Sequence, residues 1–197
     1  MSPQNFKSEL TDRILELHWK QWTAFGVSSH GDRSNEHILD LEALAVSSLT
    51  LGLSDERLFH VVLEWTQANR PWLNLNRVKK IGKYFVSADV SKKKPLLDSY
   101  VLDSFLNFLK KSISTSTVKR GEPKPLSDDR AEYVELFEKF SKLGTVVGPE
   151  IKSPCLLQLF LRNVFGVDAR AEMFLYFLSG RKGNSNLISQ EIFSEQK

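Results

Sequence analysis

The sequence predicts an all-α fold, because three observations agree along its 197 residues. Apolar residues recur at three- and four-residue steps in one segment after another, which is the spacing of one face of an α-helix. Ser, Asp and Pro stand where several of these segments begin, and Gly stands where several end, as helix caps and stops require. We find no convincing run of alternating apolar and polar residues, the pattern of a half-buried strand.

Five helices are expected in residues 1–113, which we interpret as a helical bundle domain. The first, at 4–25, carries Phe6, Leu10, Ile14 and Leu17 on one stripe, so we expect it to be broadly buried. The other four helices are expected at 41–52, 55–69, 74–88 and 95–112. Ser54 is the expected N-cap of the helix at 55–69, and the helix at 74–88 is expected to turn its basic side outward.

Residues 114–129 are predicted to be a linker, because they lack apolar periodicity and are rich in Ser, Thr, Gly and Pro. Residues 130–197 are then a helical C-terminal region. Its segment at 155–166 is apolar on almost every side and must be covered. Asp168 is expected to cap the next helix, and Ser185 or Asn186 the last. Helices are expected at 128–144, 155–166, 169–180 and 187–193.

Composition and charge narrow the class of protein. Hydrophobic residues make up 41% and charged residues 26%, which argues against a mostly disordered or fibrous chain. The single cysteine, Cys155, cannot form an intramolecular disulfide, and it favours a cytoplasmic location. Without a secretory signal or an apolar run of about 20 residues, we expect no membrane insertion.

Charge is distributed unevenly along the chain. Residues 31–64 hold two basic and seven acidic residues, whereas 77–94 hold seven basic residues and one acidic. A second basic stretch, 110–124, has five basic residues against one acidic. Such stretches suit a phosphate backbone, whose condensed counterions are released on binding. The alternative is a solvated helix face, which is common for lysine-rich segments.

The end of the chain, FGVDARAEMFLYFLSGRKGNSNLISQEIF, predicts two helices joined by a polar turn, which match the first two helices of a helix-turn-helix core. This segment resembles the winged-helix domain of bacterial transcriptional regulators. The resemblance implies that Phe174, Leu175 and Leu178 pack against the last helix, whose apolar residues are Leu187, Ile188 and Ile192. Residues 194–197 would begin the recognition helix, so we expect a domain cut short before that helix and its wing.

The N-terminal part is similar to the same group of regulators, some of which are encoded beside nucleotidyltransferase-type toxins. The similarity is carried by the pair Trp19 and Trp22, by DLEALAVSSLTLG at 40–52 and by DERLFHVVLEWTQAN at 55–69. These are mainly core positions. The resemblance implies a bacterial protein with a helical sensing or dimerisation domain.

Signatures of catalysis are missing from the sequence, which has no phosphate loop, nucleophile elbow or HExxH motif. We therefore predict a protein that is not an enzyme, with no cofactor and no metal site. The four histidines lack metal-site spacing, and Cys155 is interpreted as a buried structural residue. The tryptophans are expected mainly in the core rather than stacked on bases. Capping and solvation are preferred over metal binding for Asp40, Glu42, Asp55 and Glu56.

Two functions remain open from the sequence. The first is a DNA-binding transcriptional regulator, with duplex DNA as its partner and a homodimer or protein partner as a further option. The second is a protein-interaction module, similar to an antitoxin or adaptor, that does not bind DNA by itself. It requires an exposed apolar face on residues 154–166 or 170–179. The residues predicted to contact DNA are Arg181, Lys182, Asn184, Ser185 and Lys197, with Lys119 and Arg120 from the linker.

Overall fold

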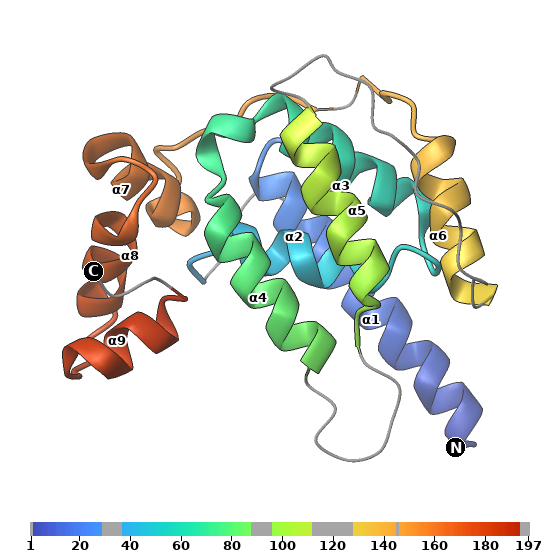
Figure 1. Ribbon diagram of the computed structural model, residues 1–197, viewed down its shortest axis with the longest axis horizontal. Coiled ribbons are helices and arrows are strands. Elements are labelled where there is room, and N and C mark those ends of the chain that lie inside the picture. The colour runs from blue at the N-terminus through green and yellow to red at the C-terminus, as the bar shows by residue number, and fades with distance from the viewer. Residues whose placement is uncertain (1, 29–36, 88–95, 112–127, 145, 194–197) are drawn as a thin grey trace.

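The computed structural model describes residues 2–28, 37–87, 96–111, 128–144 and 146–193. Regular structure in these ranges is helical, apart from an isolated antiparallel bridge between Val27 and Val146 (Figure 1). The predicted all-α fold is confirmed. No described helix has both the length and the apolarity needed to cross a membrane. The α-helices are α1 (Pro3–Ala24), α2 (Leu41–Leu49), α3 (Glu56–Ala68), α4 (Leu75–Ser87), α5 (Ser99–Lys111), α6 (Asp128–Glu138), α7 (Leu157–Phe165), α8 (Ala169–Leu178) and α9 (Ser185–Glu191).

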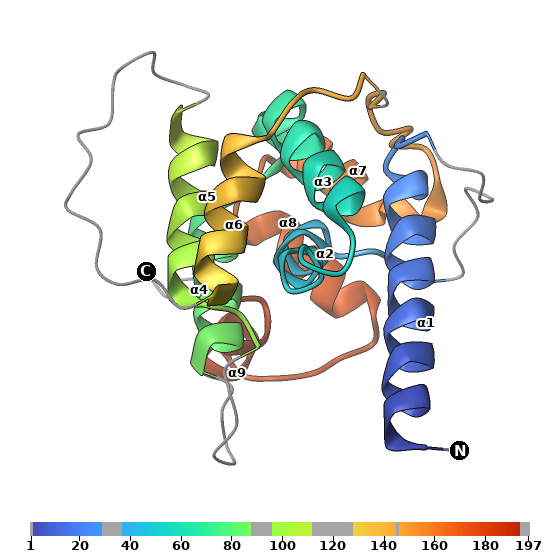
Figure 2. The same cartoon turned by 90° about the vertical axis from the view of Figure 1, so that its right-hand side faces the viewer.

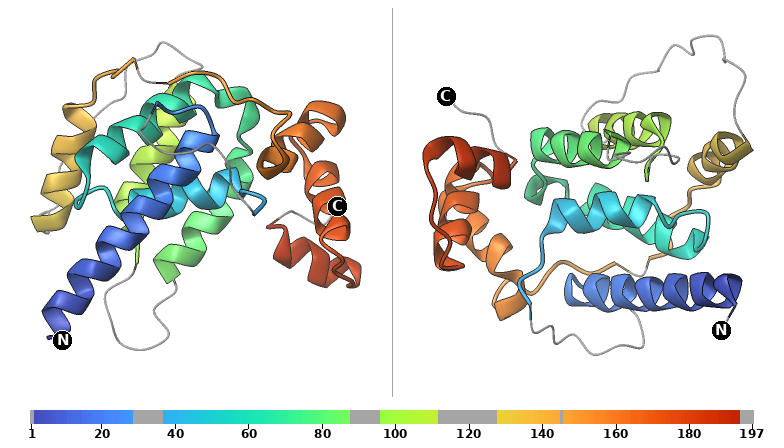
Figure 3. Two further views of the ribbon diagram at one scale, coloured as in Figure 1. Left: turned by 180° about the vertical axis from the view of Figure 1, so that it is seen from behind. Right: turned by 90° about the horizontal axis from the view of Figure 1, so that it is seen from below.

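The bundle is built in layers. Seen from below, α1 forms one layer, α2 and α3 the next, and α4 and α5 the third (Figure 3). Helix α6 packs against α3 and α5 at one end of the bundle (Figure 2). Helices α7, α8 and α9 lie together at the other end, next to α4 (Figure 1). The C-terminal helices therefore form a separate outer group beside the bundle.

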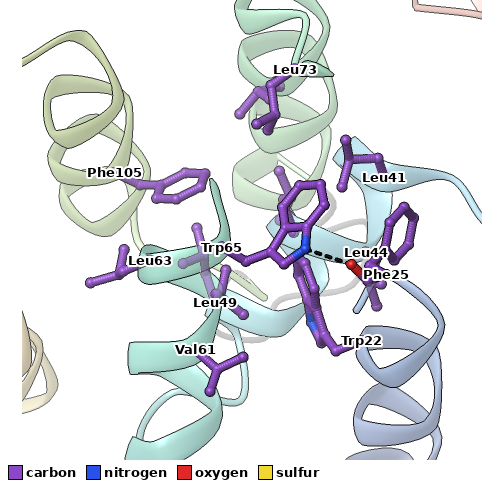
Figure 4. Close-up of a cluster of buried hydrophobic side chains, with 14 of the residues drawn as sticks. Trp22, Phe25, Leu41, Leu44, Leu49, Val61, Leu63, Trp65, Leu73 and Phe105 are labelled. Carbon is purple, nitrogen blue, oxygen red and sulfur yellow. Dashed lines mark hydrogen bonds between the residues drawn. The ribbon is translucent and has the colours of Figure 1, made fainter. Parts of the chain in front are cut away.

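The centre of the bundle is an aromatic cluster of Trp22, Phe25 and Trp65, all fully buried (Figure 4). The ring centroids of Trp22 and Trp65 are 5.5 Å apart, and those of Phe25 and Trp65 are 5.4 Å apart. Tilted and edge-on contacts at these distances suit the aromatic quadrupole. Each indole N–H has a partner: Trp65 donates to the Phe25 carbonyl at 2.8 Å, and Trp22 donates to Ser48 Oγ at 2.9 Å. Core packing is thus confirmed for these two tryptophans.

The core continues across the predicted linker. Tyr133 and Leu136 of α6, together with Cys155, Leu156 and Leu159, belong to the same buried cluster as the aromatic centre. Most of the predicted linker lies outside the described residues, and the division into domains stays a prediction. The prediction that Cys155 is buried is confirmed.

Helix caps agree with the sequence in part. Asp40 and Asp168 cap α2 and α8 as expected, each accepting a hydrogen bond from a backbone N–H of the first turn. The N-cap of α3 is Asp55 rather than Ser54, and that of α9 is Asn184 rather than Ser185 or Asn186. In both helices the observed N-cap is next to an expected one. Ser, Asp and Asn all have a side-chain oxygen that can cap a helix, so the sequence does not distinguish between such neighbours.

The expectation that α1 is broadly buried is wrong. Phe6, Leu10 and Leu17 are 58%, 48% and 50% exposed, and burial begins only at His18. The N-terminal half of the helix extends past the bundle (Figures 1 and 2). Helical periodicity identifies the apolar face correctly, but burial also requires a second element against that face.

Candidate functional site

Five charged side chains meet where the C-terminal helices join the bundle. Arg162 of α7 donates two hydrogen bonds to the Glu42 carboxylate of α2, each 2.7 Å long, and it also pairs with Glu172 of α8. Arg77 of α4 donates to Glu42 at 2.8 Å and to Asp40 at 2.6 Å. We call these five residues the ion network.

Four of the five residues of the ion network are deeply buried, whereas the Asp40 side chain is 37% exposed. Glu42, Arg77, Arg162 and Glu172 are exposed by 5% or less. Burial alone would lower the pKa of Arg162, but the charges of Glu42 and Glu172 outweigh it and raise that pKa. Burial likewise opposes the charge of Asp40, yet the hydrogen bond and charge of Arg77 hold its pKa below the ordinary value. The charged forms of Arg162 and Asp40 therefore depend on their ion-pair partners.

Backbone groups complete the network and extend it to the loops. Arg162 donates to the Trp72 carbonyl at 2.7 Å, and the N–H of Asn74 donates to Glu42 at 2.9 Å. Arg77 Nε donates to the Ile192 carbonyl just after α9, at 3.0 Å. The network thus connects the bundle to α7, α8 and α9, and it positions all three C-terminal helices relative to α4.

A cleft of about 640 Å³ lies between α4 and α8. Lys80 of α4 lines it together with Arg170 of α8, and Arg77 and Glu172 of the ion network also contribute. Lys79 and Lys83 are exposed on α4, and no ion pair joins Lys79, Lys80 or Lys83 to a carboxylate among the described residues. Arg170 pairs with Asp168 at 2.8 Å. Asp168 lines the cleft as well, so three basic and two acidic residues give its lining a net charge of +1. The cations without an ion pair among the described residues are Lys80 in the cleft and Lys79 and Lys83 on the neighbouring α4 surface.

The predicted DNA contacts lie in the turn between α8 and α9. Arg181 is 2.9 Å from Glu191 and lies over the Tyr176 ring, so its charge is partly engaged. Lys182 is exposed, and its carbonyl accepts a hydrogen bond from the Tyr176 hydroxyl. The Asn184 side chain caps α9. Ser185 is exposed at the first position of α9. Lys119, Arg120 and Lys197 lie outside the described residues.

The packing of α9 on α8 differs from the expectation. Ile188 and Ile192 are buried as predicted, but their partner in the small cluster is Tyr176. Phe174, Leu178 and Leu187 are 46%, 63% and 41% exposed, so the prediction that they pack together inside is wrong. Helix α8 turns its Glu172 and Tyr176 side inward because Glu172 pairs with Arg162. The opposite side of α8 then faces outward.

Helix α7 is covered only in part: Leu159 and Leu161 are buried as expected, but the rest of its apolar surface is not covered. Gln158 and Arg162 are buried, whereas Phe160 and Val164 are 46% and 57% exposed. The Gln158 side chain accepts a hydrogen bond from the N–H of Leu41 and donates to Glu172. These polar side chains of α7 are buried because the bundle supplies their hydrogen-bond and ion-pair partners. Apolar periodicity in the sequence does not predict this kind of burial.

The outward sides of α7 and α8 form one apolar face. On α8, the exposed residues follow the i, i+3, i+4, i+7, i+8 pattern from Arg170, which places them on one stripe. Phe165 of α7 stacks on Phe174 of α8 with a centroid distance of 4.3 Å and joins the two helices. We define the outer apolar face by its exposed large side chains: Phe160, Val164, Met173, Phe174, Phe177 and Leu178.

The ion network is the part of the site that sequence reasoning missed. The expectation that capping and solvation account for Glu42 is wrong as to solvation, because Glu42 is fully buried. The expected outward basic side of α4 is confirmed for Lys79 and Lys83 and wrong for Arg77, which is buried. A signal was present for Arg77, which lies four residues before the buried Ile81 and so on the same side of α4. For Glu42 and Arg162 the signal is weaker, since their partners are 35 and 120 residues away in the chain.

Metal-ligating side chains do not gather at one place in the part of the chain that the structure describes. No group of three or more His, Cys, Asp or Glu side chains there is arranged to hold a metal ion. His18 and His60 are both buried. His18 is hydrogen-bonded to the Ile14 carbonyl and to Ser47, and His60 is hydrogen-bonded to the Leu136 carbonyl. What the arrangement offers is binding: a cleft beside the basic side chains of α4 on one side of α8 and an apolar face on the other.

Comparisons with known proteins assign no family to this arrangement. No protein-family model matches the chain, and neither a curated protein nor a solved structure matches it. The ion network, the cleft and the outer apolar face are therefore the basis on which a function can be argued.

Proposed function

We propose that the chain is a DNA-binding transcriptional regulator in which the bundle holds a helix-turn-helix pair, α8 and α9, in a set position. The observation that carries this proposal is the group of basic side chains on α4 at the edge of the cleft. Lys79, Lys80 and Lys83 have no described acidic partner, and Lys80 faces the same cleft as Arg170. Unpaired cations at a cleft attract a phosphate backbone and gain affinity by counterion release.

The turn between α8 and α9 supports the same proposal. Lys182 and Ser185 are exposed next to the start of α9, and Arg181 is exposed beside them. In helix-turn-helix proteins, residues at helix starts and turns usually contact the DNA backbone. Arg77 donates to the Ile192 carbonyl, and this hydrogen bond links α4 of the bundle to the end of α9.

The salt dependence of DNA binding tests this function. Fluorescence anisotropy of a labelled duplex is measured over a series of salt concentrations for the wild type and for Lys79→Gln/Lys83→Gln. Each lost phosphate contact lowers the logarithmic slope by about 0.9, so the double variant should lose about 1.8. Arg181→Gln/Lys182→Gln should show a similar loss. Lys7→Gln/Lys20→Gln on α1 is the matched control, with two exposed lysines removed elsewhere. Unchanged slopes in both test variants would contradict the proposal.

A second candidate function is a protein-interaction module that does not need DNA. The outer apolar face favours it, because residues 154–166 and 170–179 both contribute exposed apolar side chains, as this candidate requires. It predicts that duplex binding is absent at moderate salt in the wild type. The anisotropy experiment therefore separates the two candidates.

A further inference from the structure

The outer apolar face has the composition of a permanent interface. Between residues 157 and 178 the exposed positions carry six large apolar side chains and a single charge, that of Arg170. The acidic residues of this stretch are Asp168, which pairs with Arg170, and Glu172, which is buried in the ion network. Homodimer interfaces are more apolar than the rest of a protein surface, and their centres are depleted of charge.

The available area also fits a dimer. An aromatic side chain offers roughly 150–250 Å² and an aliphatic one somewhat less; three of the six residues of the face are phenylalanines, and all six are 40–63% exposed. The face therefore presents on the order of 500 Å² of apolar side-chain surface. A standard interface buries about 800 Å² on each partner, and about 65% of it is apolar in homodimers, which is about 500 Å². The face supplies this amount without any contribution from the bundle.

A second apolar stripe, on α1, does not have these properties. Phe6, Leu10 and Leu17 are exposed there, but at about 100° per residue the exposed Arg13 lies within the stripe and the exposed Lys7 and Glu9 flank it. Desolvating Arg13 in a dimer on this stripe would oppose association. The α1 stripe therefore serves as a matched reference for the outer apolar face.

We propose that the outer apolar face binds the same face of a second copy of this chain, so that α7 and α8 of two chains form a four-helix interface. The face is self-complementary in chemistry, being apolar with little charge, and a two-fold axis lets one patch meet its own copy. The ion network supports this role because it anchors the polar sides of α7 and α8 to the bundle and keeps their apolar sides outward. The proposal does not rest on DNA binding, and it names the partner for the interaction-module candidate.

The oligomeric state in solution tests the proposal. Size-exclusion chromatography with light scattering should give twice the chain mass of 22.5 kDa for the wild type. Leu178→Asp places a charge on the most exposed residue of the face and should give the single-chain mass. Leu10→Asp, the same change on the α1 stripe, should remain dimeric. Both residues are about half exposed or more, so circular dichroism should show unchanged helix content in each variant.

Phe177→Asp provides a second test of the same face and should also give the single-chain mass. A monomeric wild type at high protein concentration would overturn the proposal and would assign the face to a different occupant. A dimer that survives both α8 substitutions but is lost in Leu10→Asp would also overturn it, in favour of the α1 stripe. None of these measurements involves DNA, so failure of the dimer is distinguishable from failure of DNA binding.

Discussion

The bundle and the α7–α8 pair differ in what they leave exposed. The centre of the bundle is the buried aromatic cluster of Trp22, Phe25 and Trp65. In α7 and α8, the charged Arg162 and Glu172 are buried together with Leu159 and Tyr176, whereas Phe160, Phe177 and other large apolar side chains face outward. Apolar character alone therefore does not decide which side of a helix is buried. A polar side chain can be buried when buried hydrogen-bond or ion-pair partners compensate for its loss of water. The apolar side of the same helix is then left exposed to solvent.

The sharpest test of this comparison uses two phenylalanines. Phe105 of α5 is fully buried and Phe177 of α8 is 51% exposed. Phe105→Ala should lower the free energy of unfolding by about 3–5 kcal/mol, because it removes packing and leaves a cavity. Phe177→Ala should lower it by at most about 1 kcal/mol in a monomeric sample. Urea denaturation of both variants gives the two values. Equal losses would mean that Phe177 belongs to the core and that the contrast is mistaken.

The next test breaks the ion network. Arg162→Met should destabilise the protein by about 3 kcal/mol, since Glu42 and Glu172 lose a buried counter-charge. The loss stays near the lower end of the usual range for broken buried pairs, because Arg77 still neutralises part of this charge. Arg13→Met on α1 removes a pair that is 72% exposed and should cost at most about 1 kcal/mol.

Limited proteolysis adds a structural readout to this pair of variants. In Arg162→Met, cleavage should rise first in α7 and α8, because the network anchors them to the bundle. If the two variants unfold at the same denaturant concentration, the network does not hold the C-terminal helices.

The smallest expected effect is the pH dependence of the free energy of unfolding that arises from His18 in the bundle. Burial lowers the pKa of His18 below its ordinary value of 6.5, and the hydrogen bond to the Ile14 carbonyl offsets this only in part. Below about pH 6.5 the unfolded chain then binds more protons than the folded chain, so the free energy of unfolding falls as the pH falls towards the lowered pKa. Urea midpoints at pH 7.5 and 5.5 should show this decline in the wild type. His18→Gln should reduce the decline, and an identical decline in both proteins would exclude His18 as its source.

Much of the fold could be predicted from the sequence, because helices depend on local patterns. The positions of the helices followed from apolar spacing, and the caps Asp40 and Asp168 followed from side-chain chemistry. The candidate site was less accessible. Of the DNA contacts named from the sequence, Asn184 is used as a helix cap and Arg181 is paired with Glu191. The cleft between α4 and α8 combines Lys80 and Arg170, which lie 90 positions apart.

The sequence by itself determined the helical class, the periodic apolar stripes and the basic character of α4, because each of these depends on neighbouring residues. Tertiary structure alone decided which stripes are buried. The stripe on α3 lies in the core, whereas those on α1 and α8 face outward. The physical reason is that burial is a property of a pair of surfaces. Glu42 and Arg162, 120 residues apart, join α2 to α7, and this contact turns the apolar side of the C-terminal helices towards solvent.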